Sequence, residues 1–412
     1  MKYKKRHIEP LLNASVKQFP IVVLTGPRQS GKSTLLKRFA GDKWQYVNFD
    51  LFANVEAAKR DPDLFVRSLS CRTIIDEAQK APEIFGPIKA RVDENRGERF
   101  ILSGSANFEL METISESFAG RASVLELHPF SVAEVEEKPA PVFLKGLLTG
   151  EIMPEHFRRR RATARPLDEY MFFGGYPRVF EFDSAEQKQI WLENYRTTYI
   201  ERDIRNLAQV ANLDEFQRLY RICAYQTANM LNYSNMSRDL GISVPSCKRY
   251  VSLLETSYQI LRLNPYYRNI GKRLIKTPKV YFRDTGLANL LVGHFSPDDM
   301  RYRGQIGGIF ETWVVSEVVK VLSSLPIKPL YHYWRTHNGA EIDLLIEWGG
   351  RLLPVEIKNS ARISGIVVRG FESLVPHMNK QELLPAIVIY RGSDMINLGN
   401  DRYALPVECL WA

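Results

Sequence analysis

The chain has 412 residues, too many for one ordinary hydrophobic core, and we expect two to four domains. It is 45% hydrophobic and 25% charged, as in globular proteins, and its apolar runs are too short to predict a membrane span. The basic N-terminal segment lacks the apolar run of a secretory signal. Because the four cysteines show no metal-ligand spacing, we expect reduced, buried thiols in a cytoplasmic protein.

The formal net charge of +9 is unevenly distributed along the chain. Residues 231–290 contain ten lysines and arginines and three acidic residues, which gives +10 − 3 = +7 for that segment. A concentrated basic segment predicts a polyanionic partner, and nucleic acid is the first candidate. The arginine run 158–161 has acidic residues around it and is expected to lie on a solvated surface.

A phosphate-binding loop is predicted near the N-terminus. The apolar run IVVLT (21–25) indicates a buried parallel strand, and STLLKRF (33–39) has helical spacing. Between them, GPRQSGKST fits the pattern GxxxxGK[ST], in which backbone amides and a helix N-terminus bind phosphate oxygens. Lys32 would bind the β- and γ-phosphates of ATP, and Ser33 would bind Mg²⁺. The residues predicted to bind ATP in this loop are Gly26, Pro27, Arg28, Gln29, Ser30, Gly31, Lys32, Ser33 and Thr34.

Further ATP-site residues are predicted at the ends of later strands. TIIDEAQ (73–79) ends an apolar strand in Asp76, which suits the Mg²⁺ shell, and in Glu77, which would polarise an attacking water. RFILSGSAN (99–107) places Ser103 and Ser105 where they would sense the γ-phosphate. Arg121 is either a surface residue or an arginine finger for its own or a neighbouring subunit.

These motifs, in this order, carry a family resemblance. TGPRQSGKSTLL, IIDEAQ, LSGSA, AGR and LHPFS resemble the AAA+-type ATPases of bacteria and archaea that join an N-terminal P-loop domain to a C-terminal domain of unassigned function. GGYPRVF, YIERDI and YWRTHNGAEIDLLIE extend the resemblance over nearly the whole chain. It implies an α/β fold with a parallel five-stranded ATPase core over residues 1–135 and a sensor or finger role for Arg121.

The middle of the chain is predicted to be mainly helical. Residues 136–212 read as a helical lid or connector. Residues 213–290 predict three helices and two strands around a basic turn, which is the pattern of a winged helix-turn-helix. Such a module binds DNA or serves as a spacer or protein-interaction module. In the first case the turn over 272–279 would contact DNA together with the third helix, and the contact residues would be Lys248, Arg249, Lys272, Arg273 and Lys276.

Residues 291–412 contain a second set of chemical groups. Glu311 begins an apolar helix, Asp343 lies on a predicted strand, and Glu356 and Lys358 share one face of the next strand. Glu, Asp and Glu-x-Lys in this order resemble the PD-(D/E)XK nuclease core. The resemblance implies a restriction-endonuclease-like α/β domain in which Glu311, Asp343 and Glu356 hold Mg²⁺ or Mn²⁺ and Lys358 is the catalytic lysine. An ion-paired strand face without cleavage is the alternative.

The sequence therefore predicts an ATP-hydrolysing protein whose nucleotide state controls a DNA-binding region with or without metal-dependent cleavage. The alternative is an ATP-dependent switch or scaffold that binds protein or DNA and cleaves nothing. A homo-oligomer or a protein partner is compatible with both hypotheses. A small-molecule P-loop kinase is disfavoured by Glu77 and by the long downstream region.

Overall fold

The computed structural model describes residues 3–104, 117–158, 163–201, 212–267, 277–363, 369–378 and 382–412. Among the predicted site residues, Ser105, Lys272, Arg273 and Lys276 lie outside these ranges, as does most of the arginine run 158–161. Within the described ranges, no helix is long and apolar enough to cross a membrane. Three of the cysteines are buried as predicted, but Cys71 is exposed.

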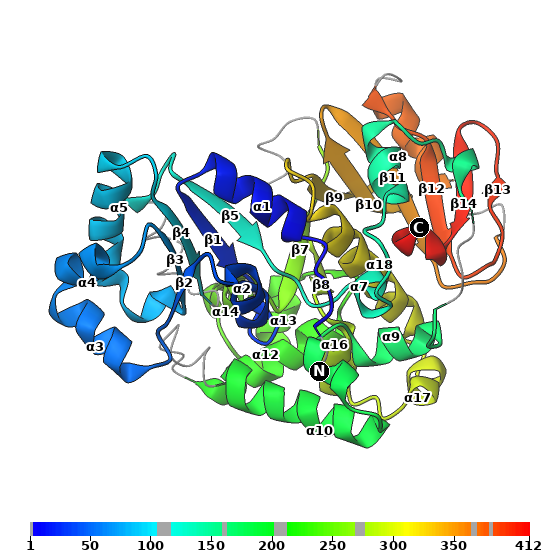
Figure 1. Ribbon diagram of the computed structural model, residues 1–412. Helices are drawn as coiled ribbons and strands as arrows, with labels where there is room; N and C mark the ends of the chain where they lie inside the picture. The colour runs from blue at the N-terminus through cyan, green and yellow to red at the C-terminus, as the bar shows by residue number, and fades with distance from the viewer. Residues whose placement is uncertain are drawn as a thin grey trace.

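The N-terminal part is the predicted parallel sheet with helices on both faces (Figure 1). In the described residues its strand order is β2-β3-β4-β1-β5, and every pairing is parallel. All five side chains of β1 are buried because both faces of this sheet are covered. The strands are β1 (Ile21–Thr25), β2 (Gln45–Asn48), β3 (Arg72–Asp76), β4 (Arg99–Ser103) and β5 (Ala122–Glu126). The helices are α1 (Glu9–Gln18), α2 (Lys32–Ala40), α3 (Phe52–Arg60), α4 (Pro62–Ser68) and α5 (Phe85–Glu94).

The connector is helical, as predicted, and it packs on the rest of the chain through large apolar side chains. The short helix α7 (Val132–Val135) precedes it, and in the described residues its α-helices are α8 (Phe143–Thr149), α9 (Leu167–Phe173) and α10 (Ala185–Tyr195). The Gly174–Gly175 pair ends α9 where a side chain would not fit. A Cβ on Gly174 would lie 2.1 Å from Asp284 Oδ1, and one on Gly175 would lie 2.4 Å from the Phe130 carbonyl oxygen.

Residues 213–290 form the predicted helices and strands, with one additional strand. The helices are α12 (Leu213–Tyr225), α13 (Tyr233–Leu240) and α14 (Val244–Thr256), and the strands are β6 (Asn229–Met230), β7 (Ile260–Pro265) and β8 (Lys279–Phe282). Ser243 caps α14 through the backbone N–H of Ser246. Gly241 ends α13 with a φ of 69°, a left-handed conformation that favours glycine.

The C-terminal part continues the sheet begun by the middle segment. In the described residues the sheet has nine strands in the order β13-β14-β12-β11-β10-β9-β7-β8-β6. β7 pairs with β9 in parallel, and this pairing joins the two segments. The remaining strands are β9 (Leu330–Arg335), β10 (Glu341–Trp348), β11 (Arg351–Lys358), β12 (Ala386–Tyr390), β13 (Ile396–Asn397) and β14 (Arg402–Pro406). The helices are α16 (Thr285–Val292), α17 (Pro297–Tyr302), α18 (Ile306–Leu322) and α19 (Arg369–Leu374).

The predicted domain boundary between residues 290 and 291 is wrong, because it cuts α16. A single cluster of buried apolar residues runs from Phe130 to Ala412, so the middle and C-terminal segments share one core. The two clusters on the faces of the parallel sheet are confined to residues 8–127. A further cluster lies between Tyr266 and Ala404 in the C-terminal part. In the described residues the four clusters thus fall into two groups, one before and one after residue 129, which we call the two cores.

Candidate functional site

The phosphate-binding loop lies at the carboxyl edge of the parallel sheet, between β1 and α2. Gly26 has a φ of +136°, and a Cβ there would lie 2.3 Å from the carbonyl oxygen of Leu127. Gly31 is the N-cap of α2 with a φ of +96°. Since both conformations favour glycine, the two glycines of the motif are explained by the backbone. The predicted loop residues run from Gly26 into the first turn of α2 at Thr34.

Lys32 is buried in this loop with 6% of its surface exposed. Its Nζ donates hydrogen bonds of 2.9 Å to the carbonyl oxygens of Gly26 and Pro27. Burial lowers the pKa of Lys32 to about 8, although the carboxylates of Glu77 and Asp76 act in the opposite direction. The ammonium group thus holds the loop together, and it feels the charges of the two predicted acidic residues.

Asp76 ends β3 and is almost completely buried. It accepts hydrogen bonds from the Ser103 hydroxyl and, at 2.5 Å, from the Tyr46 hydroxyl. Burial and the bond to Asp76 raise the pKa of Tyr46, while a hydrogen bond with Ser33 lowers it. Tyr46 thus contacts both residues predicted to hold Mg²⁺. A hydroxyl and a carboxylate are hard oxygen donors, so Ser33 and Asp76 fit Mg²⁺.

Glu77 follows β3 directly, with φ 61° and ψ 41°. Its Oε2 accepts a hydrogen bond of 2.5 Å from Gln79 Nε2. A left-handed conformation is uncommon for a residue with a side chain and is concentrated at functional sites. The turn and Gln79 together fix the direction of the Glu77 carboxylate next to the Mg²⁺ residue.

Arg121 does not reach the nucleotide site of its own chain. It precedes β5, and its carbonyl accepts from Ile21 N at the start of β1, so it lies at the amino edge of the sheet. The P-loop lies at the other end of β1, about 16 Å away for a five-residue strand. The guanidinium instead bonds the Asp93 carboxylate at 2.5 and 2.9 Å. The finger role predicted for the same subunit is therefore wrong.

The back of the P-loop is bound by residues that the sequence analysis missed. Arg6 is buried and donates to the carbonyl oxygens of Ser30 at 2.8 Å and His128 at 2.6 Å. The hydroxyl of Tyr195, on α10, donates to the Arg28 carbonyl at 3.2 Å. The loop is therefore attached both to the segment after β5 and to the connector. Arg6 and Tyr195 carry no local motif, so their role is apparent only in the fold.

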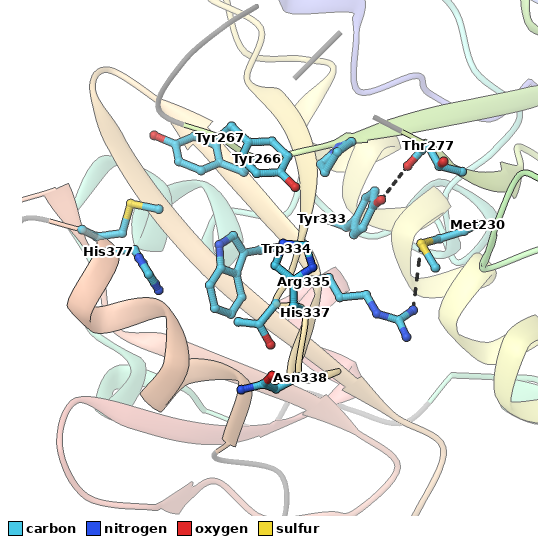
Figure 2. Close-up of a pocket in the computed structure, with 13 residues that line it drawn as sticks. Met230, Tyr266, Tyr267, Thr277, Tyr333, Trp334, Arg335, His337, Asn338 and His377 are labelled. Carbon is cyan, nitrogen blue, oxygen red and sulfur yellow. Dashed lines mark hydrogen bonds between the residues drawn. The ribbon is translucent and has the colours of Figure 1, made fainter. Parts of the chain in front are cut away.

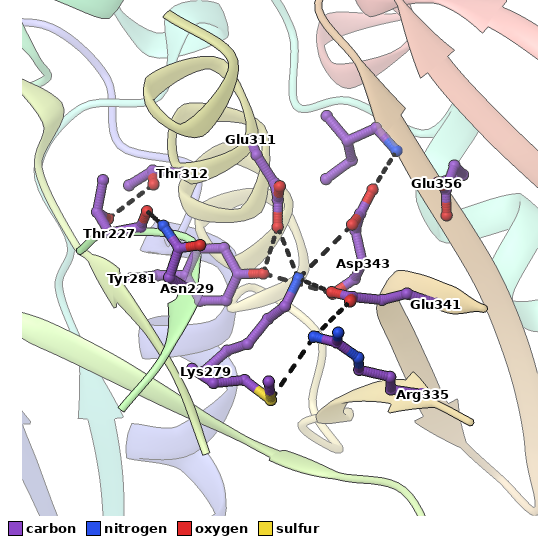
Figure 3. Close-up of polar contacts among 12 residues, drawn as sticks. Thr227, Asn229, Lys279, Tyr281, Glu311, Thr312, Arg335, Glu341, Asp343 and Glu356 are labelled. Carbon is purple, nitrogen blue, oxygen red and sulfur yellow. Dashed lines mark hydrogen bonds and ion pairs between the residues drawn. The ribbon is translucent and has the colours of Figure 1, made fainter. Parts of the chain in front are cut away.

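A second polar centre lies between α18 and the strands β8, β10 and β11. We call Glu311, Glu341, Asp343 and Glu356 the acidic cluster (Figure 3). Asp343 Oδ2 accepts from the backbone N–H of Ile357 at 2.9 Å, which ties β10 to β11. Lys358 Nζ lies 2.6 Å from Glu356 Oε1 and 4.0 Å from Asp343 Oδ2. The structure therefore brings the predicted Asp343, Glu356 and Lys358 together.

The acidic cluster contains a cation that the sequence analysis assigned elsewhere. Lys279, predicted to belong to a DNA-contacting turn, has only 5% of its side chain exposed. Figure 3 shows its ammonium pointing between Glu311, Asp343 and Glu341. Its Nζ is 3.2 Å from Glu311 Oε1 and 3.6 Å from Asp343 Oδ1, and it pairs with Glu341. The prediction that the 272–279 turn meets DNA is therefore wrong for Lys279.

Burial sets the electrostatics of the cluster. It raises the pKa of Glu311 to about 7 and that of Glu356 to about 8, and the charge of Asp343 contributes to both shifts. Within the described ranges, no three acidic, histidine or cysteine side chains are arranged to hold a metal ion. Since an ammonium already lies among the carboxylates, the predicted ligands Glu311, Asp343 and Glu356 do not fit a metal in this arrangement.

The other basic residues of 231–290 that the structure describes are either exposed or paired. Lys248 and Arg249 are exposed on α14. Arg262 bonds Glu255 at 2.7 Å, and Arg283 pairs with Glu126 at the end of β5. Three of the ten basic residues of this segment, Arg262, Lys279 and Arg283, are thus paired with carboxylates, and α14 carries two that are exposed.

An aromatic pocket of about 640 Å³ borders the acidic cluster (Figure 2). Its lining includes Tyr266, Tyr267, Tyr333 and Trp334. Arg335 lines it as well and lies 3.4 Å from Glu341 of the cluster. No local pattern predicts this pocket, because its side chains come from separate strands and loops.

Three family models match consecutive segments of the chain. Residues 18–136 match the family model of an AAA domain. Residues 164–298 and 306–410 match models of two domains of unknown function, DUF8612 and DUF4143. Two proteins described as uncharacterized, from Mycobacterium tuberculosis and Mycobacterium bovis, are each 29% identical over 410 residues, which are 99% of this chain and 85% of theirs.

Among solved structures, a Walker-type ATPase of Pyrococcus abyssi is similar, with a TM-score of 0.46 and 15% identity over 71% of this chain and 98% of that one. The family match over residues 18–136 agrees with the P-loop, the parallel sheet and the acidic strand end described above. This part of the chain is an AAA-type P-loop ATPase domain.

Proposed function

We propose that the protein binds Mg²⁺-ATP, hydrolyses it and transmits the nucleotide state to its C-terminal region. One observation carries the proposal: the P-loop with its buried Lys32 and the Asp76–Glu77 pair that ends β3 lie at the same carboxyl edge of the parallel sheet, where both carboxylates raise the pKa of Lys32 against the effect of burial. These groups come from two different strand ends, and each has the chemistry of one part of an ATPase site.

Each residue has a distinct role in this proposal. Lys32 leaves the carbonyls of Gly26 and Pro27 and binds the β- and γ-phosphates. Ser33 and Asp76 would hold Mg²⁺, which would offset the charge of the phosphates, and Tyr46, which contacts both residues, would give up these contacts. Glu77 accepts a hydrogen bond from the attacking water, which is what favours hydrolysis over phosphoryl transfer to another substrate.

The substitution Glu77→Gln tests the proposal. It keeps the shape of the side chain and removes its charge, so ATP binding should remain while phosphate release slows by about 100-fold or more. Equilibrium binding of a fluorescent ATP analogue and steady-state phosphate release measure the two properties. Glu83→Gln, at an exposed position nearby, is the matched control and should behave as wild type. Full turnover in Glu77→Gln would remove Glu77 as the water-polarising residue.

Arg121 has a place in this proposal only in an assembly. The Arg121–Asp93 pair lies on the surface, with side chains 35% and 43% exposed, where a neighbouring subunit can approach. We propose that Arg121 acts as an arginine finger on the nucleotide of a neighbouring subunit. Arg121→Ala should then lower turnover, and mixing it with the Glu77→Gln variant should restore part of the activity.

DNA is the proposed partner of the middle segment, which we interpret as a winged helix-turn-helix. The supporting observation is that Lys248 and Arg249 are exposed next to each other on α14, its third helix. Phosphate contacts would dominate, so affinity for duplex DNA should fall steeply with salt. The double variant Lys248→Ala, Arg249→Ala should bind more weakly and show a shallower dependence on salt. Binding that is independent of salt would contradict the proposal.

For the C-terminal segment we propose a restriction-endonuclease-like fold that does not cleave in the resting state. The supporting observation is the position of Lys279, which lies among the carboxylates that a nuclease would use for its metal. Linear and single-stranded DNA should survive incubation with wild-type protein and Mn²⁺, with and without ATP. Degradation that is lost in Lys358→Ala would overturn this proposal and favour the metal-dependent nuclease instead.

A further inference from the structure

Lys279 is held in the acidic cluster by the sheet itself. Its backbone lies in β8, paired with Leu263 of β7 on one side and with Met230 of β6 on the other. Tyr281, two residues further along the strand, points to the same face and donates to Glu311 Oε1 at 2.6 Å. One face of β8 therefore delivers both a cation and a hydroxyl donor to the same carboxylate of α18.

We propose that the Lys279 ammonium is the resident cation of the acidic cluster and that it excludes a divalent metal ion from it. The ammonium contacts carboxylates on two elements, Glu311 on α18 and both Glu341 and Asp343 on β10. Carboxylate oxygens are the ligands that a hard divalent cation prefers, but with the ammonium among them those of the described residues are not arranged to hold a metal ion. A metal ion bound by these oxygens would lie against the ammonium, and that juxtaposition of like charges is unfavourable.

Lys358 does not have this role. Its side chain is 38% exposed and contacts the cluster from the β11 side, mainly through Glu356. An exposed lysine can turn toward water when a metal enters, whereas Lys279 has 5% of its side chain exposed. The two lysines are therefore a matched pair, one within the cluster and one at its edge.

The proposal goes beyond the ATPase function, because it concerns a site that ATP does not touch. The strand β8, which carries Lys279, also connects the acidic cluster to the nucleotide-binding domain. Arg283, the residue after β8, pairs with Glu126 at the end of β5, close to the Leu127 carbonyl that packs on Gly26 of the P-loop. The strand that holds Lys279 in the cluster is thus attached at its end to the nucleotide-binding domain.

Manganese alone, without nucleotide, is the probe that tests the proposal on the full chain. We expect no Mn²⁺ binding at the cluster of the wild type by electron paramagnetic resonance or titration calorimetry. Lys279→Met keeps a side chain of similar length and removes its charge. It should therefore create an Mn²⁺ site whose affinity is at least about 100-fold higher than that of the wild-type cluster, since juxtaposed like charges are strongly unfavourable. Adding Asp343→Asn to Lys279→Met should abolish that site, and Lys358→Met should create none.

Three results would overturn the proposal: wild-type Mn²⁺ binding that Asp343→Asn abolishes, a folded Lys279→Met that gains no site, or a gain in Lys358→Met equal to that in Lys279→Met. If Lys279→Met fails to fold, the wild type decides. Mn²⁺ binding to the wild type that depends on Asp343 would overturn the proposal. If the wild type binds no Mn²⁺ at the cluster, and Lys279→Arg folds and binds none either, the proposal is supported. None of these measurements depends on ATP hydrolysis. A failure of the proposal about Lys279 is therefore distinguishable from a failure of the proposed ATPase function.

Discussion

Two buried lysines illustrate how neighbouring groups determine charge at the scale of the residue. Burial disfavours the ammonium form of both. At Lys32 burial outweighs the two nearby carboxylates, and the pKa falls to about 8. At Lys279 the carboxylates of Glu311, Asp343 and Glu341 outweigh burial, and the pKa rises. The first lysine is poised to gain an anionic ligand, whereas the second already has its counter-ions.

The lowered pKa of Lys32 predicts how ATP affinity depends on pH. Bound phosphates keep the lysine protonated, whereas in the free protein it loses its proton above about pH 8. ATP binding above that pH must therefore take up a proton, and affinity should fall by up to about tenfold per pH unit. Lys32→Arg keeps its charge at these pH values, so its ATP affinity should be nearly flat from pH 8 to 10. Titration with a fluorescent ATP analogue measures both, and an equal slope in the two proteins would contradict the prediction.

At the scale of the element, β8 and α18 both extend from the acidic cluster to the segment that follows β5. β8 carries Lys279 at one end, and Arg283 follows its other end. α18 carries Glu311 in its first half and Glu317 in its second half, and Glu317 Oε2 accepts from Val132 N at 2.9 Å. These elements connect the cluster to the nucleotide-binding domain through hydrogen bonds and ion pairs.

The ion pair between Arg283 and Glu126 should contribute substantially to stability. Both side chains are mostly buried, and Arg283 lowers the pKa of Glu126 against the effect of burial. Arg283→Met would leave the buried Glu126 carboxylate without its arginine and with only the His128 ring as a close partner, so the free energy of unfolding should fall by about 3 kcal/mol. The control is Arg178→Met, which removes an exposed pair with Glu181 and should change stability by less than about 1 kcal/mol. Urea unfolding measures both, and equal losses would argue against a special role for the β8–β5 contact.

At the scale of the whole molecule, the two cores predict which fragments fold. The clusters of the parallel sheet end at residue 127, and the larger cluster begins at Phe130. Fragments 1–129 and 130–412 should each unfold cooperatively in thermal circular dichroism. Fragment 1–290 should not be stable in its middle segment, because it lacks α18 and β9, against which that segment packs. A cooperative transition of the middle segment in fragment 1–290 would contradict the shared core.

Local sequence patterns predicted the P-loop residues, Asp76, Glu77 and the helices of the middle segment, because each is specified by neighbours within a few positions. The missed contacts join distant positions. Tyr46 meets Asp76 from 30 residues away, Lys279 meets Glu311 from 32, and Arg6 meets Glu134 from 128. Which side chain closes such a contact depends on strand order and register, and neither is encoded in a short pattern. The same limit explains why Arg121 was predicted at the nucleotide site of its own chain, since a motif does not tell which edge of a sheet a residue occupies.

The pairing of β7 with β9 has a consequence for how this chain can evolve. Two family models meet between residues 298 and 306, yet the strands on either side of that point belong to one sheet and cover one core. Recombination between related genes at that point would join the strands before it from one protein to the strands after it from another. The register and packing of these two halves of the sheet would have been selected separately. Residues 130–412 should therefore be inherited and exchanged as one block, whereas the ATPase domain before them can be replaced as a unit.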